Sequence, residues 1–138
     1  MRTAHVLWLL LGAFVLRVVG QALVVFAGVE WLPPMEAWMS GLMPYPQLLA
    51  SQLIIIALYA RIALDVTRGR GWFARPSRRF GTGVLVFGWV YFIVMAARGI
   101  VGLHPRAAWL RDPIPIFFHL VLASFLIVFG RWHRAHAP

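Results

Sequence analysis

Residues 6–28 read VLWLLLGAFVLRVVGQALVVFAG, an apolar run interrupted only by Arg17 and Gln21. A transmembrane α-helix needs about 20 consecutive, mostly apolar residues, so this run is long enough to cross a bilayer. An arginine at the centre of such a helix costs at least about 2.5 kcal/mol, so it normally faces a protein interior, a water-filled cavity or a ligand. The run therefore predicts a membrane span, and Arg17 indicates where along it a polar site lies.

Three further apolar segments follow, at residues 47–64, 83–101 and 114–130, and 62% of the 138 residues are hydrophobic. This composition is typical of a membrane protein. Short connections favour antiparallel neighbours. We therefore expect a single all-α membrane domain over residues 1–138, a four-transmembrane-helix antiparallel bundle. A signal peptide is the other interpretation of residues 6–28, but Arg17 interrupts the run and no small-x-small cleavage pattern follows it.

The charge pattern predicts an orientation. The formal charge is +9, and all the basic residues other than histidine are arginines. Five of them lie between the second and third segments: Arg68, Arg70, Arg75, Arg78 and Arg79. The positive-inside rule places this loop and both termini in the cytoplasm, as expected for a multi-pass protein of a bacterial inner membrane. We expect the loop to contact anionic lipid headgroups and not nucleic acid.

The first outer loop, residues 31–46, is unusually apolar for a connection in water. Pro34 suits the first turn of a helix and Glu36 its positive end, while Trp31 and Trp38 suit the membrane interface. The loop therefore predicts a short interfacial helix over the bundle.

Polar residues inside the segments form one candidate site. Gln52 and Tyr59 are seven positions apart, as are Tyr91 and Arg98, so each pair shares a helix face. With the orientation above, the outer half of the bundle holds most of the polar residues, and Arg17 lies beneath them near the midplane. The expected ligand-binding residues are Arg17, Gln21, Gln52, Tyr91, Arg98 and His119. Because no acidic residue lies deep in a segment, an anion or a carbonyl ligand fits best, either a lipid headgroup or a quinone.

His119 has three interpretations: a packing hydrogen bond, a donor to a bound ligand, or a ligand to the metal of a haem or chlorophyll. A haem held by two histidines needs a second histidine at comparable depth, and no other histidine lies inside a segment. The sequence has no cysteine, which excludes thiolate metal sites and cysteine nucleophiles. His133 and His136 alone do not predict a metal site.

The expected function is a small non-catalytic membrane subunit or binding module that holds an amphiphile and associates with itself or with a larger membrane complex. One alternative is a small membrane enzyme or transporter acting on a lipid-linked anion, with His119 as acid or base and arginines stabilising negative charge. Another is a subunit that binds haem or chlorophyll through His119 alone. No catalytic residue is assigned, because the chain shows no nucleophile–base pair.

Overall fold

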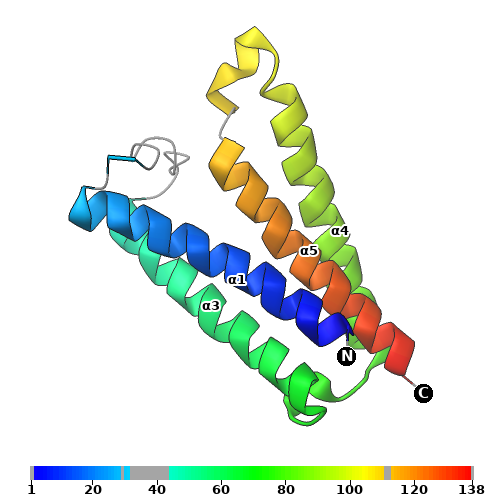
Figure 1. Cartoon of the computed structure of the whole chain (residues 1–138). Helices are drawn as coiled ribbons and strands as arrows, with labels where there is room; N and C mark the ends of the chain where they lie inside the picture. Colours follow the sequence, from blue (N-terminus) through cyan, green and yellow to red (C-terminus); the bar gives the residue numbers. More distant parts are fainter. Residues whose placement is uncertain (1, 29, 32–43, 111–112, 138) are drawn as a thin grey trace.

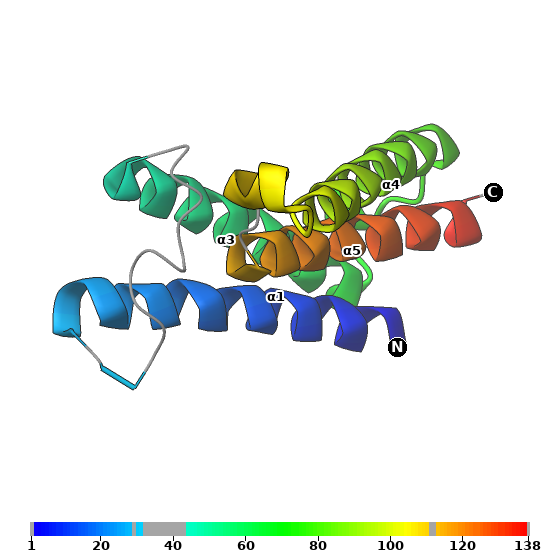
Figure 2. The ribbon, with the colours of Figure 1, turned by 90° about the horizontal axis from the view of Figure 1, so that it is seen from above.

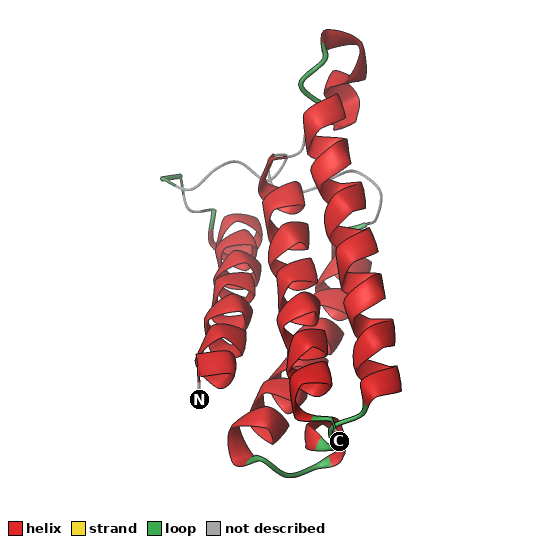
Figure 3. Ribbon diagram, turned by 90° about the vertical axis from the view of Figure 1, so that its right-hand side faces the viewer, coloured by secondary structure: helices red, strands yellow, loops and turns green. Residues whose placement is uncertain are grey.

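The described part of the chain folds into four long helices and a few short helical turns. The structure, a computed structural model, describes residues 2–28, 30–31, 44–110 and 113–137. Its long helices are α1 (Arg2–Ala22), α3 (Tyr45–Arg68), α4 (Arg78–Val101) and α5 (Pro113–His136). A π-helical turn, Leu23–Ala27, extends α1, and 3-10 turns lie at Trp72–Ala74 and Pro105–Leu110. No strand occurs in the described part of the chain (Figure 3).

Four helical stretches are long and apolar enough to cross a membrane: Arg2–Ala27, Tyr45–Arg68, Arg78–Val101 and Pro113–His136. They contain the four predicted segments, except that the first ends at Ala27, just before Gly28. The helices continue beyond the apolar segments because backbone hydrogen bonding persists where the side chains become polar, as in the last turns of α5. The interfacial helix predicted within residues 31–46 falls mainly on residues 32–43, outside the described residues.

Successive helices run in opposite directions, and both termini lie at the same end as the connection between α3 and α4 (Figure 1). This arrangement gathers the arginine-rich segments at one end of the molecule, as the charge pattern predicts. The side of the membrane that this end faces stays a prediction. At the opposite end, α4 leans away from α1 and α3, and the 3-10 turn after it projects beyond them.

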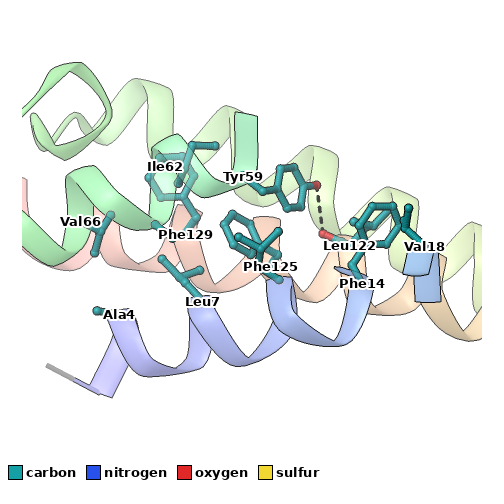
Figure 4. Close-up of a cluster of buried hydrophobic side chains, with 12 residues drawn as sticks. Ala4, Leu7, Phe14, Val18, Tyr59, Ile62, Val66, Leu122, Phe125 and Phe129 are labelled. Atoms are coloured by element: carbon teal, nitrogen blue, oxygen red, sulfur yellow. Dashed lines mark hydrogen bonds between the residues drawn. The ribbon is translucent and has the colours of Figure 1, made fainter. Parts of the chain in front are cut away.

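The hydrophobic core lies between α1, α3 and α5 (Figure 4). Its fully buried aromatic residues include Phe125 and Phe129 of α5, which pack against Leu7 of α1. Tyr59 of α3 stacks on Phe125 with ring centroids 4.1 Å apart, and its hydroxyl donates to the Leu122 carbonyl at 3.3 Å. The phenol thus satisfies its polar group on a backbone carbonyl while its ring fills the core.

Helix α4 is the outer helix and packs closely on α5 alone, which lies between α1 and α4 (Figure 2). Glycines permit this approach. A Cβ on Gly130 would lie 2.8 Å from the Leu85 nitrogen, and one on Gly81 would lie 2.7 Å from the His133 Cβ. Such small residues let membrane helices bring their backbones into contact. The bundle is therefore a core of three helices with the fourth attached along one side.

Two buried side chains, Asp65 and His133, hydrogen bond the connection between α3 and α4 at the arginine-rich end. Asp65 forms an ion pair with Arg61, four positions earlier, with Nε 3.1 Å from Oδ1, and its Oδ2 accepts from the Phe73 backbone N–H at 3.3 Å. His133, only 1% exposed, accepts from the Ser77 backbone N–H at Nδ1, at 3.1 Å. These bonds attach the connection between α3 and α4 to α3, through Asp65, and to α5, through His133.

Candidate ligand-binding site

A cavity of about 250 Å³ lies between α1, α3 and α5. Its polar lining comes from one or two residues of each helix, and its walls are apolar. The lining residues are Phe14, Arg17, Leu48, Ser51, Gln52, Ile55, Pro115, Phe118, His119 and Leu122. The cavity thus brings three residues of the predicted site, Arg17, Gln52 and His119, to one place.

These three residues lie in the half of the bundle that is distant from the termini. At about 1.5 Å per residue, Gln52 and His119 lie about 10 Å from the starts of α3 and α5, and Arg17 lies about 15 Å from Ala27. Of the three residues, Arg17 is thus the farthest from this end of its helix. The cavity is separated from the arginine-rich end by the apolar core.

Arg17 is held inside the bundle by Gln21. Arg17 is 5% exposed, and its Nη1 donates to Gln21 Oε1 at 2.6 Å, one helical turn away. The guanidinium also lies 6.0 Å from the centroid of the Phe118 ring, within the range of a cation–π interaction. Gln21 does not line the cavity. Its role in the structure is to fix the guanidinium that does.

Gln52 presents an unusual buried amide. The residue is 4% exposed and lines the cavity, yet its Oε1 makes no hydrogen bond within the described part of the chain. Buried polar atoms nearly always have a partner, and leaving one unpaired costs about 1–3 kcal/mol. The Tyr45 hydroxyl, seven positions earlier on the same helix face, is likewise buried and has no hydrogen-bond partner among the described residues. Two unsatisfied polar groups thus lie along one face of α3.

His119 is oriented from the neighbouring helix. Its Nδ1 hydrogen bonds with the Tyr91 hydroxyl of α4, and the two rings meet edge to face. Tyr91 provides the one hydrogen bond of His119 within the described part of the chain. The ring is therefore fixed through Nδ1, and its Nε2 is the nitrogen that remains for a ligand.

The predicted residues thus divide into three groups. Arg17, Gln52 and His119 line the cavity, while Gln21 and Tyr91 each hydrogen bond one of them. Arg98 does not line the cavity. It is half-buried in the last turn of α4.

Sequence reasoning missed Ser51 and Tyr45. Ser51 lines the cavity and donates to the Leu48 carbonyl at 2.8 Å, so its own hydrogen bond is satisfied. The signal for Tyr45 was present, because Tyr45, Gln52 and Tyr59 recur every seven residues on one face of α3. Aromatic residues of this region also suit the membrane interface, and that interpretation hides the place of Tyr45 in the seven-residue spacing.

The arrangement suits a ligand that carries hydrogen-bond acceptors at one end. The lining residues include a guanidinium, an amide and an imidazole but no carboxylate. Drug-sized ligands occupy about 300–1,000 Å³, so a cavity of about 250 Å³ fits a headgroup or a single ring better than a tetrapyrrole. The apolar walls favour a ligand whose remainder is hydrocarbon.

Comparison of the chain with protein-family models, with curated proteins and with solved structures gives no match.

Proposed function

We propose that this chain is a small non-catalytic membrane protein that binds the polar end of an amphiphile in the cavity between α1, α3 and α5. The ligand class is an anionic lipid headgroup or a quinone. The observation that carries the proposal is Gln52, which lines the cavity and whose buried amide oxygen has no hydrogen bond from any residue that the structure describes. Because this oxygen is an acceptor, a donor on the ligand, such as a hydroxyl of a lipid headgroup, removes the cost of its burial, and the amide N–H of the same side chain can donate to a ligand acceptor.

The chemistry of the neighbouring groups supports an acceptor-rich ligand. A guanidinium binds phosphate and carboxylate strongly, because its hydrogen bonds to them are assisted by charge. A quinone carbonyl accepts equally well from an amide N–H or from the Nε2–H of an imidazole. Arg17, Gln52 and His119 supply these donors from three different helices, so one small group can contact all of them.

The proposal is tested by adding ligand to delipidated protein and following its thermal unfolding. A ligand that binds the folded state alone stabilises it by about 2.7 kcal/mol at a concentration 100 times its Kd. We expect a short-chain benzoquinone or phosphatidylglycerol, but not phosphatidylcholine, to raise the unfolding temperature of the wild type.

Two matched variants locate the effect. Gln52→Leu removes the buried amide, whereas Gln47→Leu makes the same change at an exposed position of the same helix. The stabilisation by the benzoquinone should be lost in the first variant and kept in the second. Equal responses in Gln52→Leu and wild type would place the ligand elsewhere.

The Tyr91–His119 hydrogen bond favours one second candidate, an enzyme acting on a lipid-linked anion. The hydroxyl fixes the ring through Nδ1, as a general acid or base requires, and Arg17 lies on the same cavity to stabilise negative charge. This function predicts turnover of a polyprenyl phosphate that His119→Ala abolishes while binding persists. A binding module shows no turnover in either protein.

Location and partners complete the proposal. We infer a multi-pass protein of the bacterial inner membrane with both termini in the cytoplasm, supported by the gathering of arginine-rich segments at one end of the bundle. The broad apolar face of α4 supports association with a second copy or a larger complex, because only Gly81 and Gly88 of this helix are buried. Reporter fusions at the C-terminus test the orientation, and a periplasmic signal would contradict it.

A further inference from the structure

A second hollow lies at the arginine-rich end, between α4 and α5. It has a volume of about 440 Å³ and shares no lining residue with the cavity described above. Its lining residues are Arg78, Leu85, Trp89, Arg131, Arg134 and Ala135. We call this hollow the arginine groove, because arginines are half of its lining and no acidic residue belongs to it.

The close packing of the two helices brings these arginines together. Helix α4 begins at Arg78 beside the last turns of the antiparallel α5, and the Gly81 and Gly130 backbones touch at this end. The stem of Arg134 lies over α4, since its Cγ is 3.2 Å from the position of a Cβ on Gly81. The groove is therefore built by the helix contact and not by a loop.

The electrostatics of the groove favour an anion. The first turn of α4 contains no acidic residue and begins with two arginines, at the positive end of the helix dipole, where cations are unfavourable. Within the described part of the chain, Asp65 pairs with Arg61, and no groove arginine forms an ion pair. A bound anion would offset the repulsion among the groove arginines and also the unfavourable interaction of the first α4 arginines with the helix dipole.

The groove continues from these charges onto apolar surface. At about 1.5 Å per residue, Leu85 and Trp89 lie about 10 Å and about 16 Å along α4 from Arg78. Trp89 is 47% exposed, so its indole is accessible at this depth of an apolar helix. A soluble phosphate would contact only the charged part, whereas a lipid would contact both parts.

We propose that the arginine groove is a specific site for an anionic phospholipid, with its phosphate at Arg78, Arg131 and Arg134 and an acyl chain along Leu85 and Trp89. Basic pockets between transmembrane helices bind phospholipid headgroups by this chemistry. The site is independent of the amphiphile cavity, because the two lie at opposite ends of the bundle.

The test is native mass spectrometry of delipidated protein titrated with phosphatidylglycerol. Arg131→Gln with Arg134→Gln removes two groove charges, and Arg68→Gln with Arg70→Gln removes two exposed charges near the same end that do not line the groove. Each lost charge-assisted hydrogen bond is worth about 1.5–3 kcal/mol, so the groove pair should bind at least about tenfold more weakly than wild type. The control pair should retain wild-type affinity.

Several outcomes would overturn the proposal. Equal losses in the two pairs would show attraction to charge alone, and no loss in the groove pair would place the lipid elsewhere. Displacement of the lipid by inorganic phosphate would make the occupant a soluble anion. Arg78→Gln alone, at an exposed position, gives a second measure if the groove pair does not fold, and it should also weaken binding.

The two proposed sites are separated in the same experiment. Gln52→Leu should leave the arginine groove lipid in place, whereas the groove pair should leave ligand binding in the amphiphile cavity unchanged. Failure of one site therefore does not imply failure of the other. Equal binding of phosphatidylcholine by wild type would contradict the predicted selectivity of the groove for a net negative headgroup.

Discussion

Gln21 accepts a hydrogen bond from Arg17 at 2.6 Å, and both side chains are buried in the same helix. The pair explains how a membrane helix holds a guanidinium so far from its ends. The glutamine keeps the arginine directed towards α3 and α5, where it lines the cavity. Arg17 is thus part of a built polar site within an otherwise apolar helix.

Replacing Gln21 should destabilise the protein. Gln21→Leu removes the acceptor and leaves a buried guanidinium nitrogen without that partner, which costs about 1–3 kcal/mol. Chemical unfolding in detergent micelles measures this change. Gln47→Leu, at an exposed position, should change stability by less than about 0.5 kcal/mol. If the two variants are equally stable, the Arg17–Gln21 bond contributes nothing.

Tyr91→Phe tests the orientation of His119. The phenol is the one hydrogen-bond partner of His119 in the described part of the chain, so its loss should change the ¹⁵N chemical shifts of that ring. The ring of His133, whose Nδ1 accepts from Ser77, should keep its shifts. We expect unfolding to become easier by about 1 kcal/mol, since one neutral hydrogen bond is lost. Unchanged His119 shifts would rule out the bond.

Gly130→Ala should separate α4 from α5. The added Cβ would lie 2.8 Å from the Leu85 nitrogen and 3.0 Å from the Gly81 oxygen, and backbone atoms cannot move aside as a flexible side chain does. We expect a loss of about 1–3 kcal/mol, typical of overpacking. Gly83→Ala is the matched control, because a Cβ there meets no atom within 4 Å. That variant should be neutral or more stable by up to about 1 kcal/mol.

Asp65→Leu should expose the arginine-rich connection to trypsin. The Asp65 carboxylate accepts from the Phe73 N–H, so its loss releases the 3-10 turn at Trp72–Ala74. Cleavage after Arg68 and Arg70 should then become faster. Arg61→Gln should leave the cleavage rate nearly unchanged, because the Arg61 side chain is 62% exposed and surface ion pairs contribute about 0–1 kcal/mol. Equal rates in wild type and Asp65→Leu would contradict this role.

The four long helices were predictable from the sequence because a run of about 20 mostly apolar residues is sufficient to predict a helix that can cross a membrane. The lengths of the segments and their antiparallel order follow from the spacing of apolar runs and the shortness of most connections. The attachment of α4 to α5 alone was not predictable. Its hydropathy resembles that of the other helices, and only the three-dimensional packing shows that Gly81 and Gly130 mark a contact.

The candidate site was predictable in part. Depth along each helix correctly grouped Arg17, Gln52 and His119, because helical rise fixes depth without knowledge of packing. Which residues face inward depends on how each helix is rotated about its own axis. The depth of a residue along the helix does not determine that rotation. For this reason Arg98 was included although it lies outside the cavity.

The central claim is that the Gln52 cavity holds an amphiphile in the living membrane. The most direct measurement is native mass spectrometry of the protein purified gently from its own membrane, with the bound molecule identified after extraction. The account predicts a bound quinone or anionic lipid in wild type and in Gln47→Leu, and one bound molecule fewer per chain in Gln52→Leu, which keeps the lipid of the arginine groove. The same ligand content in both variants, or no ligand in the wild type, would contradict it.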